Sequence, residues 1–181
     1  NSMIYVREME HRDVDAVADY WLLSTPEHLM GMGVDLNKLP ERSAIKAMIE
    51  GELKKTVADR MSYALIWEYN KEAIGHCNVN QIKFGVSAFM HLHLWKSDFR
   101  QKGLGTALVK QSLPYFFDKL KLQRLYSEPY ALNPAPNKTL AKVGFSWEKK
   151  HTTIPGTLNF EQEVNRWVLN KSSYCKLLPS K

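Results

Sequence analysis

The sequence contains little that would cross-link a small fold or carry it into a membrane. Among 181 residues there are only two cysteines, Cys77 and Cys175, which lie far apart and have neither C-x-x-C spacing nor a zinc-type histidine cluster nearby. The longest apolar runs fall far short of the roughly 20 residues that a membrane helix needs, and no charged segment followed by an apolar stretch opens the chain. We therefore expect free thiols, no metal site, no membrane partner and a cytoplasmic protein.

A dense run of basic residues is also missing. The formal charge of +6 and the isoelectric point near 9.2 favour an anionic partner, but Lys54-Lys55 and Lys149-Lys150 are only short clusters. Nucleic acid, a membrane surface and a phosphorylated cofactor all meet that description. Because no stripe of Lys and Arg alternates with aromatic residues, we rank a basic RNA-binding domain last and expect no nucleic-acid partner.

What the sequence does contain is the composition of one packed domain. With 44% hydrophobic residues and mixed charges, a chain of 181 residues has the composition of a globular protein. At this length it buries about two-thirds of the surface that its unfolded form exposes. We expect residues 1–181 to form a single domain, as a monomer or a homodimer, with Asn1 and Ser2 as the remnant of an expression tag.

Hydrophobic periodicity predicts an α+β protein. Alternating and β-branched segments predict strands at 4–9, 63–69, 73–83, 89–95, 122–130, 145–149 and 164–169. Apolar residues three and four apart predict helices at 14–22, from 40 to about 60 and from 104 onward, and 136–143 is predicted as a short helix. The N-cap and N1-proline signature of Thr25-Pro26-Glu27 predicts another helix from 26 to about 31. Pro114 predicts a kink or an early end in the helix after Gly103, and Gly144 closes the last helix.

Residues 100–105, with the sequence RQKGLG, lie between a predicted strand and a predicted helix. The main-chain N–H groups of that first helical turn, together with the helix dipole, attract phosphate. Gly103 and Gly105 let a bulky pyrophosphate approach the main chain without a Cβ in the way, and Arg100 and Lys102 add positive charge. These residues alone leave open the alternative of an ordinary glycine turn before a helix.

Two other phosphate-binding motifs fail on their spacing. A mononucleotide P-loop requires G-x-x-x-x-G-K-[ST], whereas Gly105 is followed by Thr106 and Ala107. A dinucleotide fingerprint requires a third glycine, which this loop lacks.

The RQKGLG segment resembles the [QR]-x-x-G-x-[GA] loop of the GCN5-related N-acetyltransferases. Downstream, Asn133 and the segment 140–145, LAKVGF, are similar to that family's asparagine and its L-E-K-L-G-F helix end. Two motifs at a compatible separation are more specific than either alone. The resemblance covers about 89–145, extends loosely to both ends through the order of elements, and is nearest to the ribosomal-protein-alanine subgroup, which acetylates protein N-termini.

The resemblance implies a GNAT fold, in which a mostly antiparallel sheet of six to seven strands splays between strands 4 and 5 and is flanked by about four helices. It implies an enzyme that transfers the acetyl group of acetyl-CoA, its cosubstrate, to a primary amine by direct attack in a ternary complex. The acceptor would be an amine-bearing small molecule or a protein N-terminus. The implied cofactor-binding residues are Leu94, Trp95, Arg100, Gln101, Lys102, Gly103, Leu104, Gly105, Thr106, Asn133, Asn137 and Lys138.

Each part of this set has an implied role. The main chain around Leu94 and Trp95 would hold the pantetheine and the acetyl carbonyl, and the amides of 101–106 would bind the pyrophosphate. Asn133 and Asn137 would bond the pantetheine arm. Lys138 would lie near a phosphate.

The reaction also requires a group that removes a proton from the amine, whose pKa is about 8 to 10. His91 and His93 face the same side of the strand that leads to the loop, and an imidazole suits this task. His91 is the first candidate, and Glu128 on the neighbouring predicted strand is the second. The alternatives are that the histidines only fill a half-buried sheet face and that Glu128 is a surface residue. The His-Leu-His pattern is similar to the paired histidines of the arylalkylamine acetyltransferases, but lies two residues closer to the loop.

The proton donor for the departing thiolate is the point at which the chain departs from the family. Many members place a tyrosine in the helix after the asparagine, where this chain has Leu140. Tyr130 is the possible substitute, with ordinary packing as its alternative role. A main-chain N–H near Leu94 would stabilise the negative charge that builds on the carbonyl oxygen.

Acceptor specificity is expected from the two segments that least resemble the family. These are the Thr25 to Pro40 segment, with His28, Met30 and Met32, and the Thr152 to Gln162 segment. The second class of function is a non-catalytic acyl-CoA-binding sensor, which would keep the loop and lack the base.

Overall fold

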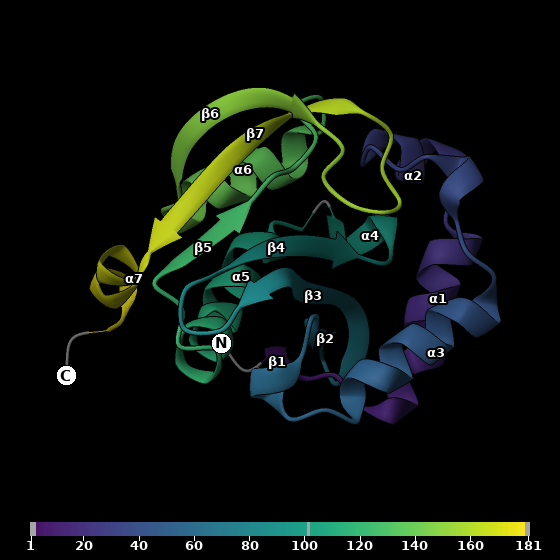
Figure 1. Ribbon diagram of the computed structural model, residues 1–181, viewed down its shortest axis with the longest axis horizontal. Coiled ribbons are helices and arrows are strands. Elements are labelled where there is room, and N and C mark those ends of the chain that lie inside the picture. The colour runs from purple at the N-terminus through teal and green to yellow at the C-terminus, as the bar shows by residue number, and fades with distance from the viewer. Residues whose placement is uncertain (1–2, 101, 180–181) are drawn as a thin grey trace.

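The computed structural model describes residues 3–100 and 102–179 and contains one seven-stranded sheet of order β1-β2-β3-β4-β5-β7-β6 (Figure 1). Every neighbouring pair is antiparallel except β4 and β5, which are parallel. This confirms the predicted α+β class and the mostly antiparallel sheet. The strands are β1 Ile4–Glu8, β2 Tyr63–Tyr69, β3 Glu72–Lys83, β4 Ser87–Leu94, β5 Arg124–Ser127, β6 Ser146–Thr153 and β7 Gln162–Asn170.

In the described part of the chain, four helices of ten residues or more pack on the sheet, two on each face. This agrees with the expected number of about four. They are α1 Val14–Leu23, α3 Arg42–Leu53, α5 Leu104–Pro114 and α6 Pro134–Val143. Shorter helices are α2 Pro26–Gly31, α4 Ser97–Arg100 and α7 Lys171–Leu177. Alternation along β2 separates the two faces: Ile66 packs with α1 and α3, and its neighbours Leu65 and Trp67 pack with α5 and α6.

Several element boundaries differ from the sequence prediction. Helix α3 ends at Leu53 and not near Arg60, because the chain turns back and the Glu52 carboxylate accepts the main-chain N–H groups of Met61 and Ser62 at 2.7 and 2.8 Å. Strand β5 is only four residues long because it leaves its partner after Ser127. Helices α4 and α7 were not predicted, since four to seven residues carry too little periodicity.

Pro114 ends α5, as predicted, and the chain continues through a wider π-helical turn at Tyr115–Lys119. Gly144, with φ of 118°, closes α6 in the left-handed conformation that favours glycine. Cys77 is buried and Cys175 exposed, and both are free thiols.

The sheet splays between β4 and β5, and this opening positions the site. The two strands pair only at Ser87↔Arg124, Ala88↔Leu125 and Phe89↔Tyr126, after which β4 runs on to Leu94 alone on that side (Figure 1). The N–H of Trp95 bonds to Ile74 on β3, so alternation directs the main-chain groups of Leu92 and Leu94 the other way, into the opening. The main-chain N–H groups of Leu92 and Leu94 thus face the opening that β5 leaves.

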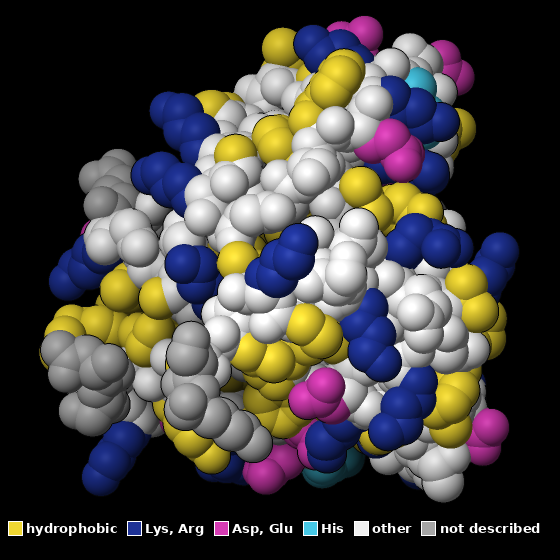
Figure 2. Space-filling model, turned by 90° about the vertical axis from the view of Figure 1, so that its left-hand side faces the viewer, with side chains coloured by type: hydrophobic (Ala, Val, Ile, Leu, Met, Phe, Trp, Pro, Cys, Tyr) yellow, Lys and Arg dark blue, Asp and Glu magenta, His cyan; other side chains and the backbone are white. Residues whose placement is uncertain are grey.

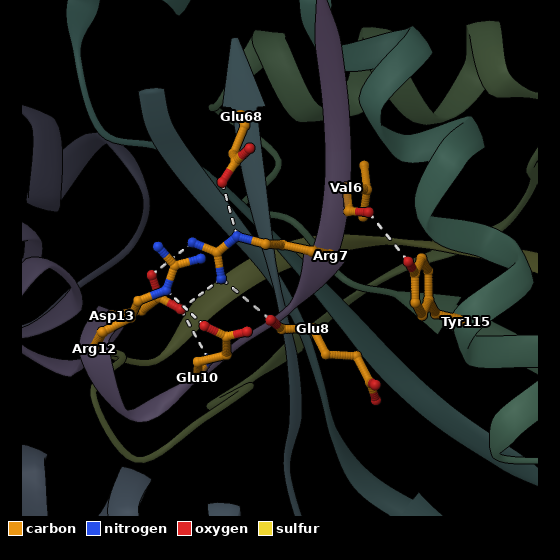
Figure 3. A network of polar contacts seen from close by, with 8 residues as sticks. All are labelled: Val6, Arg7, Glu8, Glu10, Arg12, Asp13, Glu68 and Tyr115. Carbon is orange, nitrogen blue, oxygen red and sulfur yellow. Dashed lines mark hydrogen bonds and ion pairs between the residues drawn. The ribbon is translucent and has the colours of Figure 1, made fainter. Parts of the chain in front are cut away.

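A network of charged side chains ties the first strand to its surroundings (Figure 3). The Arg7 guanidinium donates to both carboxylate oxygens of Asp13 at 2.8 Å and to Glu68 at 2.7 Å. Asp13 also accepts the main-chain N–H of Glu10 at 2.8 Å. This network joins β1, β2 and the turn that opens α1.

In the described part of the chain, no helix combines the length and the hydropathy needed to cross a bilayer. On the face shown in Figure 2, Lys and Arg side chains are scattered between uncharged ones and do not merge into one patch. On this face, the spread of basic side chains therefore matches their spread along the sequence.

Candidate active site

A cavity of about 440 Å³ occupies the splay. Its wall comes from both faces of the sheet: α1 and α2 supply one side, and α5, α6 and the loop before α6 supply the other, with Leu92 and Leu94 of β4 between them. The residues that line the cavity include Tyr20, Glu27, His28, Met32, Leu92, Leu94, Arg100, Gly103, Gly105, Thr106, Leu132, Asn133, Lys138, Thr139 and Lys142. The cavity therefore passes through the sheet at the gap between β4 and β5.

The N-terminus of α5 opens into this cavity. Gly103 precedes the helix with φ of 69°, and among the described residues, which exclude Gln101, no side chain caps the first turn. The N–H groups of that turn therefore have no intrahelical partner and are available to an anion. A Cβ on Gly103 would meet no atom within 4 Å, and one on Gly105 would contact only the side chain of Thr139, at 3.4 Å. The approach to this main chain is open.

Positive side chains surround that end of the cavity, but they are not equivalent. Lys138 and Lys142 project from α6 into the wall. Arg100 also lines the cavity, yet its guanidinium donates to the carbonyls of Leu94 at 2.9 Å and Trp95 at 3.1 Å. Arg100 therefore fixes the end of β4 in addition to contributing charge. The ammonium group of Lys102 lies over the rings of Tyr69 and Phe99, and Lys102 is not among the lining residues.

The family described as acetyltransferase (GNAT) domain matches residues 4–146. The chain belongs to this family. It is accordingly an acetyl-CoA-dependent N-acyltransferase, as the two sequence motifs implied.

Solved structures with this fold are distant in sequence. One is the spermidine N-acetyltransferase from Vibrio cholerae in complex with CoA and spermine, with a TM-score of 0.78 and 18% identity over 97% of this chain and 99% of that chain. Another is RimL, a ribosomal alpha-N-protein acetyltransferase in complex with coenzyme A, with a TM-score of 0.76 and 14% identity over 96% of this chain and 97% of that chain. A comparison with curated protein sequences finds no match.

The two asparagines that the GNAT resemblance singled out lie in different surroundings. Asn133 lines the cavity at the N-cap of α6, and its side chain makes no capping hydrogen bond. Asn137 is fully engaged elsewhere: its amide donates to the carbonyls of Tyr130 and Asn133 and accepts from Asn165 and Trp167, at 2.8–3.1 Å. Asn137 therefore holds α6 against β7, and these bonds use both the N–H and the oxygen of its side-chain amide.

At the end of β4, only one of the two implied residues faces the cavity. Leu94 lines it, with its main-chain N–H directed into the splay. Trp95 turns back to β3, where its main-chain N–H bonds to Ile74 at 2.8 Å and its indole donates to His76 Nδ1 at 2.8 Å. Leu104 begins α5 and Thr106 lines the cavity, while Gln101, Asn1 and Ser2 lie outside the described residues.

The candidate catalytic histidines share one sheet face, as predicted, but neither lines the cavity. His91 Nε2 is 2.9 Å from Asn80 Oδ1, and burial, partly opposed by Glu128, lowers the pKa of His91 to about 4. His93 lies behind Tyr20, stacked on His76 with ring centroids 4.6 Å apart. Burial first, and the neighbouring histidines next, lower the pKa of His93 well below its ordinary value.

Glu128 and Tyr130 also lie outside the cavity wall. The Glu128 carboxylate pairs with Arg166 at 3.0 Å and with His151 at 2.6 Å, so its charge is already compensated. Tyr130 packs edge-on against Phe160, and its main chain bridges to Val164 of β7. The packing alternative considered for Tyr130 describes this position.

The residues that do form the cavity wall on the α1–α2 side were only partly anticipated. His28 and Met32 were expected to contact the acceptor, and both line the cavity, whereas Met30 is exposed. Tyr20 was not singled out at all. Its hydroxyl is 2.9 Å from His28 Nε2 and 3.0 Å from His93 Nδ1. No local pattern marks Tyr20, because His93 is 73 residues away in the sequence.

The two segments expected to set specificity contact one another. Asn159 and Gln162 donate side-chain hydrogen bonds at 2.9 Å to the carbonyl of Gly33, and Val34 forms a β-bridge with Asn159. The 152–162 segment thus supports the chain that follows α2.

Proposed function

We propose that the protein transfers the acetyl group of acetyl-CoA to a primary amine by direct attack while both substrates are bound. The observation that carries the proposal is the cavity through the β4–β5 splay, with uncapped helix N–H groups at one end and the α1–α2 wall at the other. Such a passage lets two substrates meet from opposite faces of the sheet. Proximity of this kind removes the entropic cost of bringing the reactants together.

The residues around the α5 N-terminus fit the coenzyme. The N–H groups of Leu104, Gly105 and Thr106 would bind the pyrophosphate, with Gly103 leaving the approach open. Lys138 and Lys142 supply further positive charge, and the free amide of Asn133 would bond the pantetheine arm. Bound there, the coenzyme supplies the thioester as an activated acetyl group.

The acceptor would enter on the α1–α2 side. There the wall combines the carboxylate of Glu27 with Met32 and Leu132, which suits a cationic amine on an apolar chain. The two structural neighbours act on spermidine and on a protein α-amine, and a primary amine is common to both. We therefore assign the acceptor to the class of primary amines.

In the reaction the amine nitrogen attacks the acetyl carbon, the C–S bond breaks, and the sulfur leaves with the electron pair. The main-chain N–H of Leu94, directed into the splay, would stabilise the charge that develops on the carbonyl oxygen. Because Tyr130 is packed outside the wall, we propose that the thiolate leaves without a tyrosine acid. A thiol of pKa about 8.5 is a tolerable leaving group.

The test is an acetylation assay that follows CoA release with a panel of primary amines: polyamines, amino acids, aminoglycosides and peptides with free N-termini. We expect turnover with one class, and initial-rate lines that intersect when both substrates are varied. Parallel lines and an acetylated enzyme would contradict direct attack. Tight acetyl-CoA binding without CoA release from any amine would favour the sensor.

A further inference from the structure

We propose that His28 accepts the proton that the acceptor amine loses, and that Tyr20 and His93 hold its ring in the tautomer that can do so. This inference rests on the proposed function. It differs from the sequence-based choice of His91, which lies away from the cavity.

Three elements bring these side chains together. Tyr20 comes from α1, His28 from α2 and His93 from β4, and the Tyr20 hydroxyl lies within 3.0 Å of a ring nitrogen of each histidine. Tyr20 is 4% exposed and touches the cavity, while His28 forms part of the wall. The Tyr20 hydroxyl is also 3.2 Å from Met32 Sδ.

The proton inventory of this chain favours one arrangement. A tyrosine hydroxyl has a single proton, so it donates to one histidine and accepts an N–H from the other. When it donates to His93 Nδ1, the Nε2–H of His28 donates back to the hydroxyl. The remaining nitrogen, His28 Nδ1, then carries a lone pair, and no hydrogen bond to it is found within the described residues. A neutral imidazole in this tautomer is a proton acceptor.

The histidines behind Tyr20 support that direction. The Trp95 indole donates to His76 Nδ1, which fixes the neutral His76 ring with its proton on Nε2. His76 stacks on His93, and burial lowers the pKa of both rings, so neither carries a charge at neutral pH. In the arrangement that we propose, the neutral His93 ring has its proton on Nε2 and accepts the Tyr20 hydroxyl at Nδ1. Because His93 resists protonation, the proton taken from the amine stays on His28, at the wall.

The charged groups that face His28 are few. Arg100 from α4 repels a proton on the ring, and Glu27, its neighbour in α2, lies at the same wall. Burial first, and Arg100 second, lower the pKa of His28 to about 4, so the ring is uncharged at neutral pH. A neutral ring is the form that a base requires.

The step balances without an added reactant. As the amine nitrogen bonds to the acetyl carbon and the C–S bond breaks, one proton moves from that nitrogen to His28 Nδ1. The electron pair of the broken bond stays on sulfur. His28 then returns its proton to the departing sulfur or to solvent, which restores the neutral ring.

The test compares His28→Gln, His28→Ala and Tyr20→Phe with the matched control His11→Gln, whose ring is exposed at the start of the chain. We expect His28→Gln to lower kcat by about 100- to 10,000-fold, with the acetyl-CoA dissociation constant within about threefold of wild type. Added imidazole should restore part of the activity of His28→Ala. Tyr20→Phe should lower kcat about tenfold with little change in KM, because the base remains and only its tautomer is less constrained. His11→Gln should match wild type.

Full activity of His28→Gln would overturn this inference and leave the proposed function intact. Equal losses of activity and acetyl-CoA binding in His28→Ala, with no imidazole rescue, would make His28 a structural residue and also overturn it. Wild-type protein that binds acetyl-CoA but turns over no amine would instead refute the proposed function, and this inference with it.

Discussion

The Arg7 network and the cavity wall are both rich in polar groups, but they satisfy them in opposite ways. Around Arg7, every carboxylate has a partner: Asp13 and Glu68 bond to the guanidinium (Figure 3). The Glu8 carboxylate accepts from Tyr63 and Lys119. At the cavity, the first turn of α5 has no cap and Asn133 has no side-chain partner in the described chain. His76 on β3 and His91 and His93 on β4 are buried and uncharged at neutral pH.

The polar groups around Arg7 bond to one another and stabilise the fold, whereas we propose that the groups at the cavity bond to the substrates. A buried polar group without a partner costs free energy, and a fold tolerates this cost where a substrate completes the bonding. The Arg7 network should therefore govern stability with little effect on binding. The cavity groups should do the reverse.

The largest expected difference between the two regions is in how their contribution to the free energy of unfolding changes with acid. Burial lowers the pKa of His76 to about 3 and that of His91 to about 4, so below pH about 6.5 the unfolded chain binds protons that the folded chain does not. Stability therefore falls as pH drops from about 6.5 towards 4, by about 1.4 kcal/mol per pH unit for each such histidine. Urea unfolding between pH 7.5 and 4.5 measures this slope. His91→Gln should reduce it by about one proton, and a slope equal to that of the wild type would contradict the prediction.

The Arg7 network should respond only at lower pH. Burial alone would raise the pKa of Asp13, but the hydrogen bonds from Arg7 and the Glu10 N–H outweigh it and hold this pKa below its ordinary value. The stability that Asp13 contributes is therefore present at neutral pH and lost only as pH falls below about 3.8.

Arg7→Ala should be the most destabilising single change in this comparison. It leaves the partly buried carboxylates of Asp13 and Glu68 unpaired, which should cost about 3 kcal/mol of unfolding free energy. Chemical denaturation measures the loss, and calorimetry should show acetyl-CoA affinity unchanged. The control is Arg12→Ala, whose ion pair with Glu10 is exposed and should contribute less than about 1 kcal/mol. Equal losses in the two variants would show that burial of the Arg7 network has no energetic consequence.

Gly103→Val should weaken acetyl-CoA binding by about 10- to 100-fold, because a branched side chain disfavours φ of 69° and obstructs the first turn of α5. Gly51→Val is the matched control, since Gly51 lies in α3 with open space around its Cα. Titration calorimetry checks both. Unchanged affinity of Gly103→Val would remove the phosphate site from this loop.

The same contrast holds between Asn133 and Asn137, which lie only four positions apart in the chain. Asn137→Ala should cost about 2–3 kcal/mol of stability, because four hydrogen bonds are lost. Asn133→Ala should change stability by less than about 0.5 kcal/mol and weaken acetyl-CoA binding about fivefold to tenfold. Thermal unfolding and calorimetry on both variants test this prediction. A stability loss in Asn133→Ala and an affinity loss in Asn137→Ala would reverse the two roles.

Lys138→Ala and Lys142→Ala should produce the smallest changes, each weakening acetyl-CoA binding about twofold to fivefold. The loss should shrink at high salt, where exposed charges are screened. Lys54→Ala, an exposed lysine after α3, should have no effect. If Lys54→Ala weakened acetyl-CoA binding as much as Lys138→Ala and Lys142→Ala, the effect of these lysines would come only from the net charge of the protein.

Much of the fold followed from short-range pattern. Alternation gave β2 its observed bounds, Tyr63–Tyr69, and Asn70 and Lys71 form the expected turn, with φ of 48° and 68°. Thr25 caps α2 through the N–H of His28, as its place before Pro26 indicated. By contrast, the strand predicted at 122–130 is about twice as long as the observed β5, Arg124–Ser127. The point at which β5 diverges from β4 depends on the whole sheet and not on residues 122–130 alone.

The site divides in the same way. Gly103 and Gly105 were predicted because the loop, its spacing and the following helix are contiguous in the chain, whereas Asn137 matched the downstream motif and bonds to β7 in the structure. Whether an amide faces a cavity or a neighbouring strand depends on Asn165 and Trp167, which the motif does not contain.

The sequence by itself determined the family and most element types, because each depends on residues a few positions apart. Only the tertiary structure decided which side chains meet in the splay. Tyr20, His28 and His93 come from three elements and share one hydroxyl, and a hydrogen bond across 73 residues of sequence leaves no local trace. The position of a base is set by packing, so it becomes visible only when the sheet and its helices are assembled.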